Sequence, residues 1–284
     1  MELTSSHPCF GGSQRFYRHD SRAIGLPMRF AVYLPPNAVA GAKVPALLYL
    51  AGLTCTEETF PIKAGAQRLA AQLGLALIAP DTSPRGAGVT GEAESWDLGV
   101  GAGFYLDATQ APWAQHWRME SYLLDELLPL VGEQLPIDVQ RLGIFGHSMG
   151  GHGALTLALR HPGVFKSVSA FAPIANPMNC AWGQKAFTAY LGEDRTAWTA
   201  HDASALMTTK TQVPYPAGIL IDQGLGDKFL LEKQLLPEAF ALACEQVGQP
   251  LQLRQHADYD HGYYFIQSFM QNHLRHHAGQ LGGN

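Results

Sequence analysis

The chain has 284 residues, of which 46% are hydrophobic and 15% charged, and its formal net charge is −5. A composition this apolar excludes a disordered chain. The acidic balance, without any run of Lys or Arg, argues against nucleic acid or an anionic membrane as a partner. We therefore expect one globular domain over residues 1–284, with no nucleic-acid and no membrane partner.

The N-terminal residues and the cysteines bear on location. Residues 1–12 have neither a basic start nor a continuous apolar run, so they do not resemble a secretory signal. The four cysteines, at positions 9, 55, 180 and 244, are widely spaced and form no Cys-x-x-Cys pair. In a chain of this size, that spacing favours free thiols over a disulfide framework. We expect a cytoplasmic protein.

In chain order, strand patterns alternate with helix patterns. Strands are predicted at residues 14–19, 28–34, 45–50, 75–79, 142–145, 167–171, 218–222 and 251–255, and helices at 64–73, 119–133, 151–160, 232–247 and from about 263. The stretch between 171 and 218 predicts mainly loop. This alternation is typical of an α/β protein with a mostly parallel sheet covered by helices on both faces. In such sheets the chemistry lies beyond the C-terminal ends of the strands.

A candidate nucleophile lies at Ser148. Residues 146–150, Gly-His-Ser-Met-Gly, match the G-x-S-x-G pattern. The match follows an apolar strand directly and precedes a helix directly, which is the arrangement of a nucleophile elbow. The flanking glycines suit its sharp, strained turn. An ordinary glycine-rich turn is the alternative, but the context favours the elbow and an α/β-hydrolase fold.

A serine nucleophile needs a base and an acid that orients the base. In this fold both follow the serine along the chain, the acid before the histidine. Asp227 lies in a glycine-containing loop beyond a strand and is the preferred acid; a simple helix cap is its alternative role. Asp222 is its rival, although it falls within the strand. His261, in a loop, is preferred over His256, which closes the last strand.

The remaining histidines are less suited to the role of base. His147 and His152 flank the nucleophile too closely along the chain. His273, His276 and His277 are predicted on the solvated face of the terminal helix.

Two backbone N–H groups are candidates for an oxyanion hole. One belongs to Met149, directly after the nucleophile. The other belongs to Leu53, in the loop after the third sheet strand, where Gly52 permits a close approach.

Other residues near these loops have two possible roles each. Cys55 is either a thiol beside the pocket or a buried small hydrophobe. Trp182 either closes a small acyl pocket or serves packing alone. The glycine-rich stretch 83–109, with Trp96, either lines the substrate cleft or only packs. Its acidic residues, including Asp97, lack the spacing of metal ligands and predict a solvated acidic loop.

Several longer blocks resemble one known family. They are residues 50–57, 80–86, 101–109, 146–154, 176–187 and 258–265. Together they span most of the chain and are similar to those of the S-formylglutathione hydrolases, the esterase D family. The resemblance implies hydrolysis of the thioester S-formylglutathione to formate and glutathione, in formaldehyde removal. It also implies the triad Ser148, Asp227 and His261 and a homodimer. The residues themselves indicate no cofactor and no metal.

Three other functions remain open at this point. A general carboxylesterase would use the same triad on small-acyl esters. An acyltransferase would replace water by an alcohol. A non-catalytic binding module usually has a broken triad, whereas candidates for all three members are present here.

Overall fold

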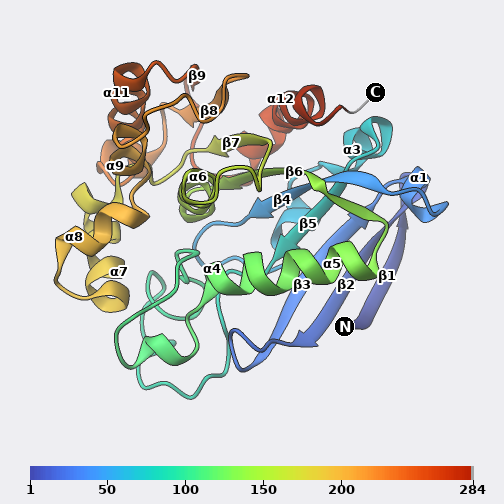
Figure 1. The fold of residues 1–284 in the computed structure, drawn as a ribbon, viewed down its shortest axis with the longest axis horizontal. Coiled ribbons are helices and arrows are strands. Elements are labelled where there is room, and N and C mark those ends of the chain that lie inside the picture. The colour runs from blue at the N-terminus through green and yellow to red at the C-terminus, as the bar shows by residue number, and fades with distance from the viewer. Residues whose placement is uncertain (283–284) are drawn as a thin grey trace.

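The structure is a computed structural model that describes residues 1–282. Its centre is a nine-stranded sheet in the order β1-β2-β3-β5-β4-β6-β7-β8-β9 (Figure 1). The strands are β1 Glu2–Cys9, β2 Gly12–Asp20, β3 Pro27–Leu34, β4 Val44–Leu50, β5 Ala76–Pro80, β6 Ile137–His147, β7 Ser167–Phe171, β8 Ile219–Gly224 and β9 Leu251–His256. Six neighbouring strands of this sheet, β5, β4, β6, β7, β8 and β9, are mutually parallel. The strands β1, β2 and β3 extend the sheet in antiparallel pairing beside β5. The predicted α/β architecture is confirmed.

Helices cover both faces of the sheet. They are α1 Pro36–Val39, α2 Thr59–Lys63, α3 Gln67–Leu73, α4 Met119–Ser121, α5 Leu128–Gln134, α6 Met149–Arg160, α7 Ala181–Leu191, α8 Arg195–Trp198, α9 Ala203–Thr208, α10 Lys228–Leu231, α11 Pro237–Val247 and α12 Tyr263–Leu281. A π-helical turn, Tyr122–Leu127, joins α4 to α5. α3 and α12 pack together on one face, and α5, α6 and α11 cover the other (Figure 1). None of the helices in residues 1–282 has the length and hydropathy needed to cross a bilayer.

The largest differences between the fold and the sequence prediction lie in three places. β1 was not predicted: most of its side chains are exposed, so it lacks an apolar pattern. The stretch predicted as loop after 171 contains α7, α8 and α9. The helix predicted from 232 begins at Pro237 instead, and the residue before it, Leu236, has φ 52°. Proline disfavours helical backbone in the residue that precedes it, which explains the later start.

The terminal helix also corrects the prediction for its histidines. His273 and His277 are fully buried, and His276 is partly buried. His277 contacts the hydroxyls of Ser167 and Ser169 at 2.6 and 2.9 Å. The expected solvated face is therefore wrong: the helix turns these imidazoles toward the sheet, where strand hydroxyls pair with them.

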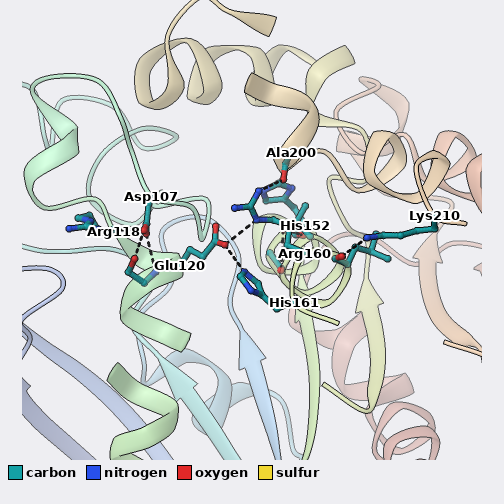
Figure 2. A network of polar contacts seen from close by, with 12 residues as sticks. Asp107, Arg118, Glu120, His152, Arg160, His161, Ala200 and Lys210 are labelled. Carbon is teal, nitrogen blue, oxygen red and sulfur yellow. Dashed lines mark hydrogen bonds and ion pairs between the residues drawn. The ribbon is translucent and has the colours of Figure 1, made fainter. Parts of the chain in front are cut away.

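A polar network holds the far end of α6, the helix that begins directly after Ser148. Arg160 donates to the carboxylate of Glu120 at 3.0 Å, and Nε2 of His161 lies 2.6 Å from the same carboxylate (Figure 2). Arg160 also donates to the carbonyl of Ala200, and Lys210 donates to that of Leu159. Cations at a helix C-terminus complement the helix dipole and anchor the last turn.

Buried histidines make the stability of the fold depend on pH. Burial lowers the pKa of His273 and His201 to about 4 and that of His152 to about 3. In the unfolded chain an imidazole binds a proton near pH 6.5. Their stabilisation is thus complete above about pH 6.5 and is lost as the pH falls toward the folded-state values.

We predict that the free energy of unfolding, measured with urea, falls between pH 7 and pH 5. Each of the three histidines contributes up to about 1.4 kcal/mol per pH unit. His273→Asn should reduce this slope, whereas the same change at the exposed His7 should leave it as it is. A free energy of unfolding that is flat over this range would contradict the account.

Candidate functional site

Ser148 lies at the sharp turn between β6 and α6. Its backbone angles are φ 58° and ψ −119°, a conformation that is strained for any residue with a Cβ. Three backbone bonds hold it there: its N–H donates to the carbonyl of Phe171 at 3.0 Å, and its carbonyl accepts from the N–H groups of His152 and Ile174 at 2.9 and 3.2 Å. The turn therefore presents this side chain at the C-terminal end of the parallel strands, as the elbow motif predicts.

Two glycines permit this turn because the backbone of β4 approaches it closely. A Cβ on Gly150 would lie 1.9 Å from the carbonyl oxygen of Leu50. A Cβ on Gly146 would lie 2.2 Å from the carbonyl oxygen of Gly150 and 2.7 Å from that of Leu50. All three contacts are with backbone, which cannot move aside as a flexible side chain can. No other residue fits at these two positions.

Asp227 and His261 meet behind the cleft. The Oδ2 atom of Asp227 lies 2.5 Å from Nδ1 of His261. Its Oδ1 atom accepts from the backbone N–H of Phe229 at 2.8 Å, and Gln223 donates to Oδ2 at 3.3 Å. Asp227 is fully buried. It thus caps the short helix α10 and contacts the imidazole at the same time, so the two roles weighed from the sequence are compatible.

The rival residues form a separate cluster. Asp222 lies within β8, as predicted, and receives two bonds from Arg254, at 2.6 and 2.5 Å. His256 and His273 each contact it at 3.1 Å. Although burial opposes the charge, bonds from His273 and Arg254 hold the pKa of Asp222 well below its usual value. The two rivals are thus neighbours of each other and lie apart from the residues that line the cleft at Ser148.

A cleft of about 200 Å³ lies over Ser148. It is lined by Gly52, Leu53, Thr54, Cys55, Trp96, His147, Ser148, Trp182, Phe229, His261 and Tyr263. Larger hollows exist elsewhere on the surface, such as one of about 670 Å³ near Arg18 and Glu133, but they hold none of the predicted site residues. The small cleft therefore brings together Ser148, His261 and Leu53, with Cys55 and Trp182 in its wall.

Hydrogen bonds from the stretch 83–109 hold the loop that carries Leu53 in place. Thr54 N–H donates to the carbonyl of Gly101 at 2.8 Å. The hydroxyl of Tyr105 donates to the carbonyl of Ala51, also at 2.8 Å. Arg85, paired with Asp81, donates to the carbonyl of Cys55 at 3.1 Å. These bonds hold the loop beside the elbow, so the stretch 83–109 supports the site and does not only pack at a distance.

The comparisons with known proteins agree with this geometry. Residues 21–276 match the family model described as "Putative esterase". The S-formylglutathione hydrolase of Mus musculus is 53% identical over 281 residues, covering 99% of both chains. The chain belongs to the S-formylglutathione hydrolase family. The Paracoccus denitrificans member is 55% identical over 99% of this chain and 98% of its own length. A solved S-formylglutathione hydrolase from Agrobacterium tumefaciens superimposes with a TM-score of 0.95 at 47% identity, covering 99% of this chain and all of that one.

In this member of the S-formylglutathione hydrolase family, aromatic rings surround the imidazole of His261. Phe229 meets it edge-on, with ring centroids 4.8 Å apart, and His147 lies 4.4 Å away. Burial lowers the pKa of His147 well below its usual value, so this ring is neutral. The position of His147 beside the nucleophile argues against it as a base, and nothing in the sequence points to Phe229 or Tyr263 as part of the cleft wall. Their positions follow from tertiary packing.

The wall also contains Cys55, which is partly buried. Burial raises the pKa of its thiol, against the opposing effect of bonds to Thr59 and Tyr263. The side chain is therefore a neutral thiol at neutral pH.

The close contact at Gly150 gives a direct test of the elbow. We predict that Gly150→Ala destabilises the protein by about 3 kcal/mol or more, because the new methyl group has no space. As a matched control, Gly279→Ala adds a methyl group to α12 with nothing within 4 Å and should stabilise by about 0.5–1 kcal/mol. Urea unfolding measures both changes. Equal stability of the two variants would show that the packing at the elbow is not as tight as described.

Proposed function

We propose that the chain hydrolyses S-formylglutathione to formate and glutathione through an acyl-enzyme on Ser148. The proposal rests mainly on the 53% sequence identity to the S-formylglutathione hydrolase of Mus musculus, over 99% of both chains. The hydrogen bond that Asp227 accepts from His261, which lines the same cleft as the strained serine, supports it independently.

The reaction proceeds in two steps, acylation of Ser148 and hydrolysis of the acyl-enzyme. In the first, Ser148 Oγ attacks the formyl carbon while His261 Nε2 takes its proton and Asp227 holds the imidazole at Nδ1. The N–H groups of Leu53 and Met149 donate to the tetrahedral oxyanion. The C–S bond then breaks, and His261 returns the proton to the glutathione sulfur. In the second step, water attacks the formyl ester with His261 as base, which releases formate and restores the serine.

The wall of the cleft suits a small acyl group. We assign Trp182 to this wall, where it packs against Phe229 with ring centroids 4.6 Å apart and limits the length of the acyl chain. Cys55 contributes a neutral thiol to the same wall and does not act as nucleophile, because burial raises its pKa. The chemistry is complete with water and these side chains, so the proposal includes no metal or cofactor.

We further propose that the protein is a single domain, forms a homodimer and acts in the cytoplasm, in the removal of formaldehyde. The single nine-stranded sheet, whose strands lie between Glu2 and His256, supports the first point. The resemblance to the family supports the dimer and the removal of formaldehyde, and the four free cysteines support the cytoplasm.

The choice between this function and a general carboxylesterase can be tested with purified protein. We predict that kcat/KM for S-formylglutathione exceeds that for 4-nitrophenyl acetate by about tenfold or more, because the small cleft favours the formyl group. Ser148→Ala should lose both activities by about 10³-fold or more. Equal kcat/KM for the two substrates would favour the carboxylesterase, and full turnover by the serine variant would exclude Ser148 as nucleophile.

A further inference from the structure

Trp96 is a large apolar side chain at the rim of the cleft that the reaction scheme leaves unused. It lines the cleft, yet 54% of its surface is exposed. Its indole meets Trp182 edge-on, with ring centroids 5.4 Å apart and an interplanar angle of 86°. A tryptophan beside a binding cleft, with much of its surface free, is typical of a residue that contacts a ligand.

The segment that carries Trp96 has a fixed base. Trp96 and Asp97 form the tip of a turn that a β-bridge between Ser95 and Leu98 closes. At the base, the N–H of Gly99 donates to the hydroxyl of Tyr190 at 2.8 Å, and the indole of Trp117 donates to the carbonyl of Gly99 at 3.1 Å. These partners are buried, so the turn projects from a rigid support.

The tip is tied to α7 by a group of three side chains, which we call the latch. Lys185 on α7 lies 2.5 Å from the carboxylate of Asp97 and donates to the hydroxyl of Ser95 at 2.8 Å. The Ser95 hydroxyl also donates to Asp97, at 2.5 Å. The acidic residue is therefore paired and largely buried, with 12% of its side chain exposed, and the predicted solvated loop is wrong for Asp97. Because α7 also carries Trp182, the latch fixes the two indoles relative to each other.

The size of the cleft indicates which part of a substrate reaches Trp96. Its volume of about 200 Å³ is below the range of about 300–1,000 Å³ that encloses a drug-sized ligand. The reacting thioester occupies the cleft at Ser148, so a tripeptide leaving group has to extend over the rim. Trp96 is the exposed aromatic side chain of that rim among the described residues.

We propose that Trp96 binds the peptide part of the leaving group and that the latch, Lys185 with Asp97 and Ser95, holds the indole in position for it. This inference rests on the proposed function and adds a specificity-determining residue to it. The contact is remote from the bond that breaks, so it binds ground state and transition state equally and acts on KM.

The test compares two substrates with the same acyl group, S-formylglutathione and S-ethyl thioformate, which lacks the peptide. Trp96→Ala should raise KM for S-formylglutathione about tenfold with kcat within about twofold, because it truncates an aromatic contact. The kcat/KM for S-ethyl thioformate should stay within about twofold of wild type. Trp96→Phe should recover part of the affinity.

Binding can also be measured without turnover, with S-methylglutathione, a thioether that cannot be cleaved. Its Kd should be lowest for wild type, higher for Trp96→Phe and highest for Trp96→Ala.

Substitution of each charged residue of the latch tests its role. Lys185→Met and Asp97→Asn should each raise KM for S-formylglutathione about threefold, and the double variant should be no worse than either, as expected for one shared interaction. A matched control is Arg141→Met, which breaks a similarly exposed ion pair with Asp138 outside the cleft, 2.8 Å long. It should leave KM unchanged.

The outcomes separate the inference from the function on which it rests. If Trp96→Ala affects both substrates equally, or neither, the assignment to the leaving group is overturned. Latch variants with wild-type KM overturn the positioning role. If wild type cleaves S-formylglutathione no better than S-ethyl thioformate, the proposed function fails before any variant is made. The Kd of S-methylglutathione then still decides whether Trp96 binds the peptide.

Discussion

The arrangement of the site depends on one close packing contact between two backbones. The first turn of α6 lies against the end of β4. The carbonyl of Leu50 comes so close to Gly150 there that no side chain fits at position 150. This contact sets the angle at which the chain leaves β6, and so the strained conformation of Ser148. It also places the loop that follows β4 and carries Leu53 beside Met149, the first residue of α6. Both proposed oxyanion donors are thus positioned by the same contact.

Electrostatics then distinguishes two buried pairs of aspartate and histidine that the sequence alone leaves as rivals. The charge of Asp222 is balanced by Arg254, which donates to both of its carboxylate oxygens. Among the described residues, the imidazole of His261 is the only basic side chain within 4 Å of Asp227. A buried carboxylate with no other counter-charge stabilises the imidazolium that forms when its histidine takes a proton. The pair that lacks an arginine is therefore the one suited to base catalysis, and the other pair stabilises the edge of the sheet.

Much of this could be predicted from the sequence because the signals are local. Apolar strands, the elbow at Ser148 and the position of Asp227 after a strand all depend on neighbouring residues. The partner of each buried polar group depends on contacts far apart in the chain and could not be predicted. Thus His273 and His277 turn toward strand hydroxyls, Asp97 pairs with Lys185, and the cleft wall takes in Phe229. The exposed β1 was missed for the opposite reason, since it lacks a buried face.

The most direct test of the central claim compares the two aspartates by the same substitution. Asp227→Asn and Asp222→Asn are each measured for kcat on S-formylglutathione, with circular dichroism to show that both are folded under the assay conditions. We predict a fall in kcat of about 10⁴-fold for Asp227→Asn, because the imidazole loses its orienting carboxylate. For Asp222→Asn we predict kcat within a few-fold of wild type, with a lower free energy of unfolding. A large fall in kcat for Asp222→Asn together with an active Asp227→Asn would contradict the account.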